Sequence, residues 1–167
     1  MDTRMGKEDY YLDIADAVLN RSTCMRRKYG AIIVRNDEIL STGYNGAPRG
    51  RRNCTDVGMC MRETLGIPSG ERYELCRSVH AEANAIISAA RRDMLGGTLY
   101  LVGRDAKTHE LLEETMPCSM CKRLIINAGI TQVVVRTGSE SHKVIHVRDW
   151  VFNDDTILDP EFEGKGD

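Results

Sequence analysis

The stretches VHAEANA at residues 79–85 and MPCSMC at residues 116–121 decide how this chain is organised. Together they offer one imidazole, His80, and two thiols, Cys118 and Cys121. A catalytic zinc ion has three protein ligands of this kind when its fourth position is left for water or substrate. Zinc held in this way lowers the pKa of a bound water to about 7, and Glu82 is close enough in sequence to carry the proton. We therefore predict a catalytic zinc site.

The spacing within each stretch constrains the local structure. Residues two apart on a helix point about 200° apart, so His80 and Glu82 can share a site only if His80 lies at or before the first helical turn. Cys118 and Cys121 are three apart and share a helical face, with Pro117 in the first turn. Two helix N-termini should then meet at the metal, where their partial positive charge favours thiolates.

The C-x-x-C motif on its own has two other interpretations, a structural zinc ribbon and a redox-active dithiol. The additional pair of His80 and Glu82 at a helix start favours a catalytic site over both.

Length and charge indicate one ordinary domain, which we place at residues 1–158. The chain has 167 residues and a formal net charge of −2, and its basic residues cluster only at 26–28 and 49–52. A large nucleic-acid footprint is therefore not expected. No apolar run could span a bilayer and no secretory signal pattern is visible, so we expect a cytoplasmic protein without a membrane partner.

Hydrophobic periodicity predicts a mixed sheet that is covered by helices on both faces. A hairpin with an Asn36-Asp37 turn opens the sheet, and strands that alternate with helices follow it. We expect Trp150, Val151 and Phe152 to pack on the body or on a neighbouring subunit, and the acidic tail at 159–167 to be disordered. The expected strands lie at 31–34, 39–44, 98–102, 132–135 and 143–147, and the expected helices at 7–20, 81–90 and 117–128.

A long excursion at residues 45–79 separates the hairpin from the first zinc-binding stretch. Loops of this length in compact domains are functional, or are held by something other than a hydrophobic core. Cys54, Cys60 and Cys76 lie in this excursion, and Cys24 precedes the hairpin. Because four thiolates complete a closed structural zinc site, we predict a second zinc on these cysteines. The alternative is four free thiols, since cysteines are often buried without a ligand role.

The chain resembles the deoxycytidylate deaminases of the cytidine deaminase superfamily. The motifs HAEANAI at 80–86 and PCSMC at 117–121 mark the superfamily, while RRKYGAIIV at 26–34 and GYNG at 43–46 point to the deoxycytidylate branch. The resemblance implies an α/β fold, namely a three-layer α/β/α sandwich on a mixed five-stranded sheet. It also implies hydrolysis of dCMP to dUMP, and homo-oligomers that are often hexamers.

The resemblance further implies individual roles. Zinc is expected on His80, Cys118 and Cys121, with Glu82 as the proton shuttle. Asn45 is expected to contact the sugar, and the Ala81 backbone to help hold the base. Relatives are often activated by dCTP and inhibited by dTTP, and Gly43, Tyr44, Asn45 and Gly46 match a motif implicated in effector binding.

A nucleoside monophosphate needs a cationic end to its pocket. Arg26 and Arg27 are our candidates for substrate binding, and the cluster at 49–52 adds three further guanidinium groups. The alternative for any one of these arginines is a solvated surface position or a subunit salt bridge.

Two other functions share the same motifs. One is a deaminase of another base or nucleotide, such as tRNA adenosine, cytosine or cytidine, and the acidic charge balance argues against tRNA. The other is a non-catalytic zinc module linked to DNA uptake. Glu82 argues against the module, because a purely structural site does not need a proton carrier beside its metal.

Overall fold

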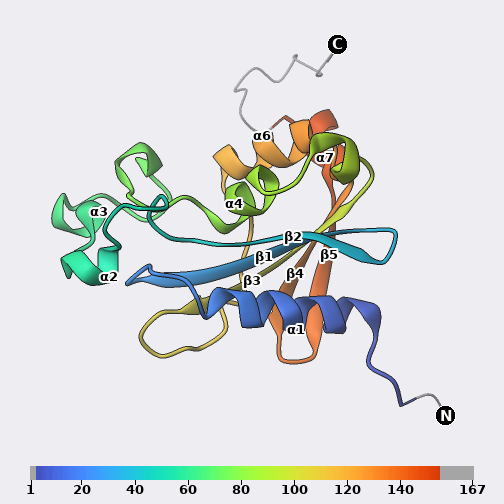
Figure 1. Ribbon diagram of the computed structural model, residues 1–167, viewed down its shortest axis with the longest axis horizontal. Coiled ribbons are helices and arrows are strands. Elements are labelled where there is room, and N and C mark those ends of the chain that lie inside the picture. The colour runs from blue at the N-terminus through green and yellow to red at the C-terminus, as the bar shows by residue number, and fades with distance from the viewer. Residues whose placement is uncertain (1–2, 155–167) are drawn as a thin grey trace.

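The computed structural model describes residues 3–154 and contains a five-stranded mixed sheet in the order β2-β1-β3-β4-β5. Helix α1 covers one face, and α4, α6 and α7 cover the other (Figure 1). The predicted α/β/α sandwich is confirmed. The elements are α1 (Lys7–Leu19), β1 (Arg27–Arg35), β2 (Glu38–Tyr44), α2 (Cys54–Val57), α3 (Met61–Thr64), a 3-10 turn (Tyr73–Leu75), α4 (Ala81–Ile87), α5 (Arg91–Met94), β3 (Thr98–Asp105), α6 (Ser119–Ala128), β4 (Gln132–Gly138), β5 (Ser141–His146) and α7 (Val147–Phe152).

The strand pairing follows from the connections. Strands β1 and β2 form the predicted hairpin, and Asn36 and Asp37 in its turn have φ of 52° and 62°. This left-handed backbone matches the twist of a two-residue hairpin and suits Asn and Asp. Strands β3 and β4 are parallel, which requires a crossover, and α6 lies in that connection. Strand β5 pairs antiparallel with β4 and ends at His146, so Val147 begins α7 and is not the strand residue we expected.

Alternating residues of the central strands supply two separate cores. On β1, Ile32 belongs to the core beneath α1, together with Leu12 and Leu19, whereas Ile33 belongs to the core beneath α4 and α6. Successive strand side chains point to opposite faces, so the continuous apolar run of β1 is what a central strand between two helical layers needs.

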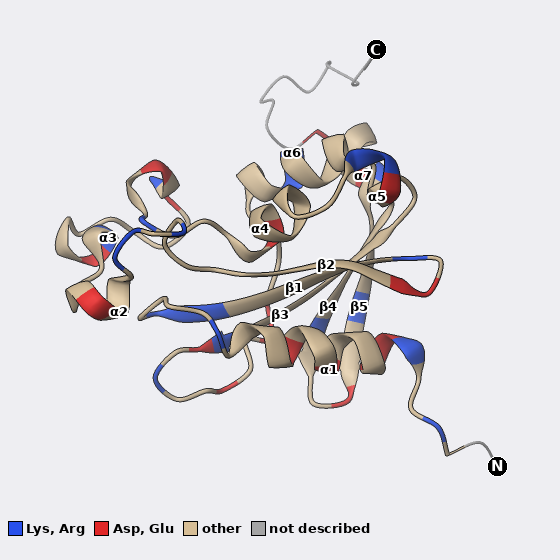
Figure 2. Ribbon diagram, viewed as in Figure 1, with Lys and Arg blue, Asp and Glu red and all other residues tan. Residues whose placement is uncertain are grey.

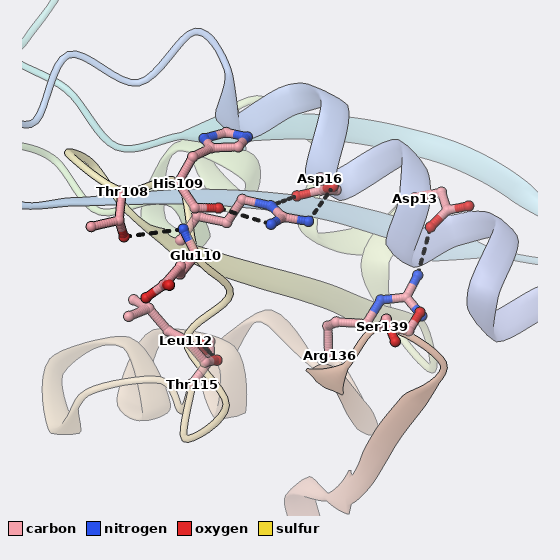
Figure 3. Close-up of polar contacts among 10 residues, drawn as sticks. Asp13, Asp16, Thr108, His109, Glu110, Leu112, Thr115, Arg136 and Ser139 are labelled. Atoms are coloured by element: carbon pink, nitrogen blue, oxygen red, sulfur yellow. Dashed lines mark hydrogen bonds and ion pairs between the residues drawn. The ribbon is translucent and has the colours of Figure 1, made fainter.

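Ion pairs fasten α1 to the sheet. Arg136 of β4 is only 5% exposed, and it donates to Oδ1 of Asp9 at 2.8 Å. It also donates to Oδ1 of Asp13 at 2.6 Å (Figure 3). Arg104 of β3 makes a two-pronged contact with both carboxylate oxygens of Asp16, at 2.6 and 3.0 Å. Three acidic residues of α1 are therefore held to the sheet by ion pairs, in addition to the apolar contacts of the same helix.

The prediction that Trp150, Val151 and Phe152 pack on the body is confirmed for Trp150, and packing on a neighbouring subunit stays a prediction for the other two. Trp150 packs against the core below α6, but Val151 and Phe152 are exposed in the described chain, Phe152 by 70%. The predicted acidic tail at 159–167 lies outside the described residues. Among residues 3–154, none of the helices has the length and apolar content that crossing a membrane requires.

Because Arg136 is buried, removing its acidic partners should destabilise the protein more than removing Arg136 itself. Replacing Asp9 and Asp13 together by Asn leaves a buried guanidinium without a counter-charge, and we expect a loss of about 2 kcal/mol in the free energy of unfolding, because the partly exposed acids reduce the full value. The Arg136→Met control removes the buried charge itself and should cost less. Urea denaturation of both variants measures the two values, and a larger loss for Arg136→Met would contradict this account.

A candidate zinc centre between two helix N-termini

The two predicted zinc-binding stretches meet at the starts of α4 and α6. His80 is the N-cap of α4 and Cys118 is the N-cap of α6, both with extended backbone and neither with a side-chain capping bond. Pro117 therefore precedes the cap and does not lie in the first turn as we expected. The two cap side chains are turned toward one another, and Nδ1 of His80 lies 3.4 Å from the Sγ atoms of both Cys118 and Cys121.

These spacings fit a zinc ion. Tetrahedral zinc with usual Zn–N and Zn–S bond lengths places the nitrogen and sulfur atoms roughly 3.5 Å apart. The three candidate ligand atoms lie within 4.8 Å of one another, and within residues 3–154 these side chains are the group whose spacing could hold a metal ion. The donor set of one imidazole and two thiols leaves the fourth position open, as in catalytic zinc sites.

The charges of the three groups prepare them for a cation. The hydrogen bond from Cys121, together with His80, holds the pKa of Cys118 well below that of a free thiol. Cys121 donates that bond and is buried, so its pKa is raised. The bond to Cys118 raises the pKa of His80. A metal ion would take the place of the protons that this cluster shares.

Glu82 lies beside the metal group in the first turn of α4 and is only 5% exposed. Burial raises the pKa of its carboxyl group, while His80 and a hydrogen bond with Cys121 act against this shift. A carboxyl group with a raised pKa accepts and releases a proton closer to neutral pH than an exposed one does. Its place and environment suit a proton carrier.

Strand β2 holds α4 in position. A Cβ atom added to Gly43 would lie 2.2 Å from the carbonyl oxygen of Ala81 and 2.4 Å from the nitrogen of Ala85. Asn84 donates to the carbonyl of Tyr44 at 2.8 Å, and the Ser41 hydroxyl donates to the carbonyl of Ala85 at 2.7 Å. Gly43 and Tyr44, which we predicted for effector binding, therefore have a structural role in placing the metal-binding helix.

Asn45 organises the backbone beside the cavity. Its Oδ1 accepts from the Ser22 hydroxyl at 2.6 Å and from the Tyr29 amide at 2.8 Å, and its Nδ2 donates to the carbonyl of Arg27 at 2.9 Å. The side chain is buried, yet the residue lines the same cavity as His80 and Glu82. Gly46, the last residue of that motif, forms an isolated bridge with Val79 just before the metal-binding helix.

The cavity that His80 and Cys118 line is also lined by several guanidinium groups. Arg26, Arg27 and Arg62 line it, and Arg26 also pairs with Glu63 at 3.0 Å. Figure 2 shows the basic start of β1 on the side of the molecule that carries α2 and α3. The arginines at 49–52 are exposed and are not among the described residues that line the cavity. Arg62 was missed by the sequence analysis, because one arginine in a polar excursion carries no distinguishing signal.

The other four cysteines gather near the same cavity. Cys54 is buried, and its pKa is raised by burial and by the neighbouring Cys24, Cys76 and Cys60. Cys24, Cys60 and Cys76 line the cavity. Within residues 3–154, however, the four thiols do not form a metal-binding group of the kind that His80, Cys118 and Cys121 form.

Comparison with known proteins gives a consistent result. A family model described as the cytidine and deoxycytidylate deaminase zinc-binding region matches residues 5–137. The chain is 39% identical to the deoxycytidylate deaminase of Mycobacterium phage D29 over 79% of this chain and 95% of that protein. It is 35% identical to the deoxycytidylate deaminase of Schizosaccharomyces pombe over 80% of this chain, but it spans only 38% of that longer protein.

A solved structure supports the same grouping. The dCMP deaminase of cyanophage S-TIM5 in complex with dCMP and dUMP is similar with a TM-score of 0.53 and 26% identity, over 80% of this chain and 84% of that one.

The contact between β2 and α4 can be tested through Gly43. Gly43→Ala forces the strand away from backbone atoms of α4, so we expect a loss of about 1 to 3 kcal/mol in unfolding free energy and weaker zinc binding, since His80 moves with its helix. Thr42→Ala, an exposed neighbour on β2, is the control and should leave zinc binding unchanged. Thermal unfolding and zinc titration measure both effects. Equal behaviour of the two variants would show that the contact does not position the site.

Proposed function

This chain belongs to the family of zinc-binding cytidine and deoxycytidylate deaminases, and we propose that it hydrolyses dCMP to dUMP and ammonia. The observation that carries the proposal is the buried Glu82 carboxyl group beside the triad of His80, Cys118 and Cys121, at a cavity that arginines also line. The named activity of the phage D29 relative, which this chain covers nearly in full, supports dCMP as the substrate.

The proposed reaction assigns each group one task. His80, Cys118 and Cys121 would hold the zinc ion, which when bound would supply an activated water for attack on the amino-bearing carbon of the pyrimidine ring. Glu82 takes one proton from the attacking water and passes it to the ring nitrogen, and it then moves the second water proton, from the new hydroxyl group on the ring carbon, to the amino group, which leaves as ammonia. Water and dCMP are thereby consumed, and dUMP and ammonia are released.

Substrate contacts are proposed for residues around the cavity. We place the base against the Ala81 backbone and the sugar near Asn45, and we assign the phosphate to the end of the cavity that carries Arg26 and Arg27. The fork of a guanidinium group matches the geometry of a phosphate, and two of them compensate its double charge. The pairing of Arg26 with Glu63 makes Arg27 the better candidate of the two for direct contact.

The competing functions differ in what Glu82 does. A deaminase of cytosine, cytidine or tRNA adenosine would use Glu82 in the same way on another substrate. A non-catalytic module linked to DNA uptake would not use it at all. Activity measurements on a Glu82 variant therefore separate these two possibilities.

We also propose a second, structural zinc on Cys24, Cys54, Cys60 and Cys76. The gathering of the other three thiols around Cys54 supports it, as does the absence of a continuous apolar core in residues 45–79. Binding would require the four sulfurs to close around the ion. The proposed thiolates need a reducing compartment, which is consistent with a cytoplasmic location.

Assembly and regulation complete the proposal. We propose a homo-oligomer, with a hexamer favoured, that dCTP activates and dTTP inhibits through the segment at 43–46. An apolar surface groove supports an interface between subunits, because Ala83 of α4 and Met120 and Leu124 of α6 line it. Exposed apolar surface of this kind is typical of contact sites.

Substrate specificity is tested by the loss of the cytosine absorbance band. Zinc-loaded protein should deaminate dCMP in preference to CMP, deoxycytidine and dCTP, each tested alone as a substrate. The assay of dCMP is repeated with dCTP and Mg²⁺ present, because dCTP is the proposed activator.

The role of Glu82 is tested in the same assay. Glu82→Gln should keep its zinc and lose at least about 100-fold in turnover, because general acid–base catalysis contributes that much. Glu114→Gln, at an exposed position, is the control. Turnover that survives in Glu82→Gln would sink the proposed mechanism, and no turnover on any substrate would favour the non-catalytic module.

The second zinc is tested by counting metal. Purified protein should hold about two zinc ions per chain, since one open and one closed site are proposed. Cys54→Ser should lose one ion and unfold at a lower temperature, while Cys118→Ser should lose the other ion and all activity. A single zinc per chain in active wild-type protein would remove the second site from the proposal.

A further inference from the structure

One buried charge in the excursion has no role in the proposed reaction. Arg62 of α3 is only 7% exposed, and its guanidinium group donates from Nε to the carbonyl of Glu71 and from Nη2 to the carbonyl of Pro68, both at 3.0 Å. An arginine this deeply buried must satisfy its donors, and these two bonds fold the turn at residues 66–72 around its side chain. Arg62 thereby fixes the chain that leads into Tyr73.

The same guanidinium group also contacts the ring of Tyr73, which in turn contacts the ring of His80. Its Cζ lies 4.5 Å from the centre of the Tyr73 ring, and the Tyr73 ring meets the His80 ring at 4.9 Å with an interplanar angle of 90°. A cation over an aromatic face and an edge-to-face ring pair are both attractive arrangements at these distances. Tyr73 is thus held by Arg62 on one side and contacts the imidazole on the other.

The His80 ring needs such a contact. Histidines that bind metal are usually oriented through their second ring nitrogen, which donates to a carboxylate or a carbonyl. Within residues 3–154, the hydrogen-bonding contacts of the His80 ring are those of Nδ1 with Cys118 and Cys121. The aromatic ring of Tyr73 is what lies against the imidazole in place of a polar partner.

Tyr73 also lines two spaces. It lines the cavity that contains Glu82 and Cys118, and it lines the groove formed by Met120 and Leu124. Burial raises the pKa of its hydroxyl, so the side chain remains neutral. The ring therefore contacts His80 as a neutral group, through its shape and its aromatic surface.

We infer that Tyr73 is a positioning residue for the His80 ligand, and that Arg62 clamps Tyr73 in place. Through these contacts, the ordered segment at residues 61–73 of the excursion helps to fix the orientation of the His80 ring. This segment therefore contributes to ligand geometry as well as to the cavity wall. This inference rests on the proposed zinc site, but it does not depend on which substrate the enzyme uses.

The test compares the ring with the hydroxyl group. Zinc affinity is measured by competition with a chromophoric chelator, and ligand geometry by the visible spectrum of the Co²⁺-substituted protein. Tyr73→Leu should bind zinc about 10-fold more weakly and shift the Co²⁺ bands, a loss typical for residues that orient a ligand. Tyr73→Phe keeps the ring and should match the wild type within about twofold, because the inferred contact does not use the hydroxyl.

Arg62 is tested in the same assays with a matched control. Arg62→Met should reproduce the weaker zinc binding and the shifted spectrum of Tyr73→Leu, and turnover should fall mainly in kcat. Arg72→Met, an exposed arginine of the same excursion, should match the wild type. Far-UV circular dichroism confirms the fold of each variant.

Two results would overturn the inference. A wild-type Co²⁺ spectrum and zinc affinity in Tyr73→Leu would leave Tyr73 as a cavity wall only, and equal losses in Phe and Leu variants would assign the effect to the hydroxyl. Wild-type protein that binds zinc normally but does not deaminate dCMP would refute the proposed function, while the comparison of metal sites among the variants would still decide this inference.

Discussion

The structure depends on the meeting of two helix starts at one point. His80 and Cys118 occupy cap positions where the backbone is extended, so their side chains point beyond the helix ends and toward each other. A cap residue normally satisfies its own helix, and here that contribution is given up in favour of the contact between helices. The cost is offset by the sheet beneath: β2 ties α4 through Ser41 and Asn84, and α6 lies in the crossover between the parallel strands β3 and β4. The register of the sheet therefore determines how His80 and Cys118 lie relative to each other.

Burial acts to raise the pKa of both Cys118 and Glu82, but it decides the outcome only for Glu82. For Cys118, hydrogen bonds with Cys121 and His80 lower the pKa of the thiol although burial opposes this shift. For Glu82, loss of solvent raises the pKa and keeps a proton within reach. The lowered pKa of Cys118 therefore depends on hydrogen bonds, whereas the raised pKa of Glu82 depends on its burial in the first turn of α4, the helix against which Gly43 packs. Gly43 lies against the backbone of Ala81 and Ala85, the helix turn that contains Glu82. A larger residue at Gly43 would therefore also disturb the surroundings of the Glu82 carboxyl group.

Most of the fold and the centre of the site could be predicted from sequence, because both arise from local patterns. The hairpin turn at Asn36 and Asp37, the apolar run of β1 and the spacing of His80, Cys118 and Cys121 each constrain structure within a few residues. The excursion could not be predicted in this way. Arg62 is buried by contacts with Pro68, Glu71 and Tyr73, and nothing in its local sequence distinguishes it from the exposed Arg72. The placing of Pro117 before the helix also escaped prediction, because a proline is compatible with both positions.

The two halves of the cavity consequently differ in what keeps them ordered. The half that carries His80, Glu82 and Cys118 is built on helices packed against a sheet, and it can open only when that core is disrupted. The half that carries Arg62 and Tyr73 is fixed by hydrogen bonds, a cation over a ring and short helical turns, with little apolar burial of its own. Segments with few buried apolar contacts open at a lower free energy than the core does. By this measure the segment that carries Arg62 and Tyr73 is less stable than the helices that carry His80 and Cys118, and the contact between the Tyr73 and His80 rings is where the two meet.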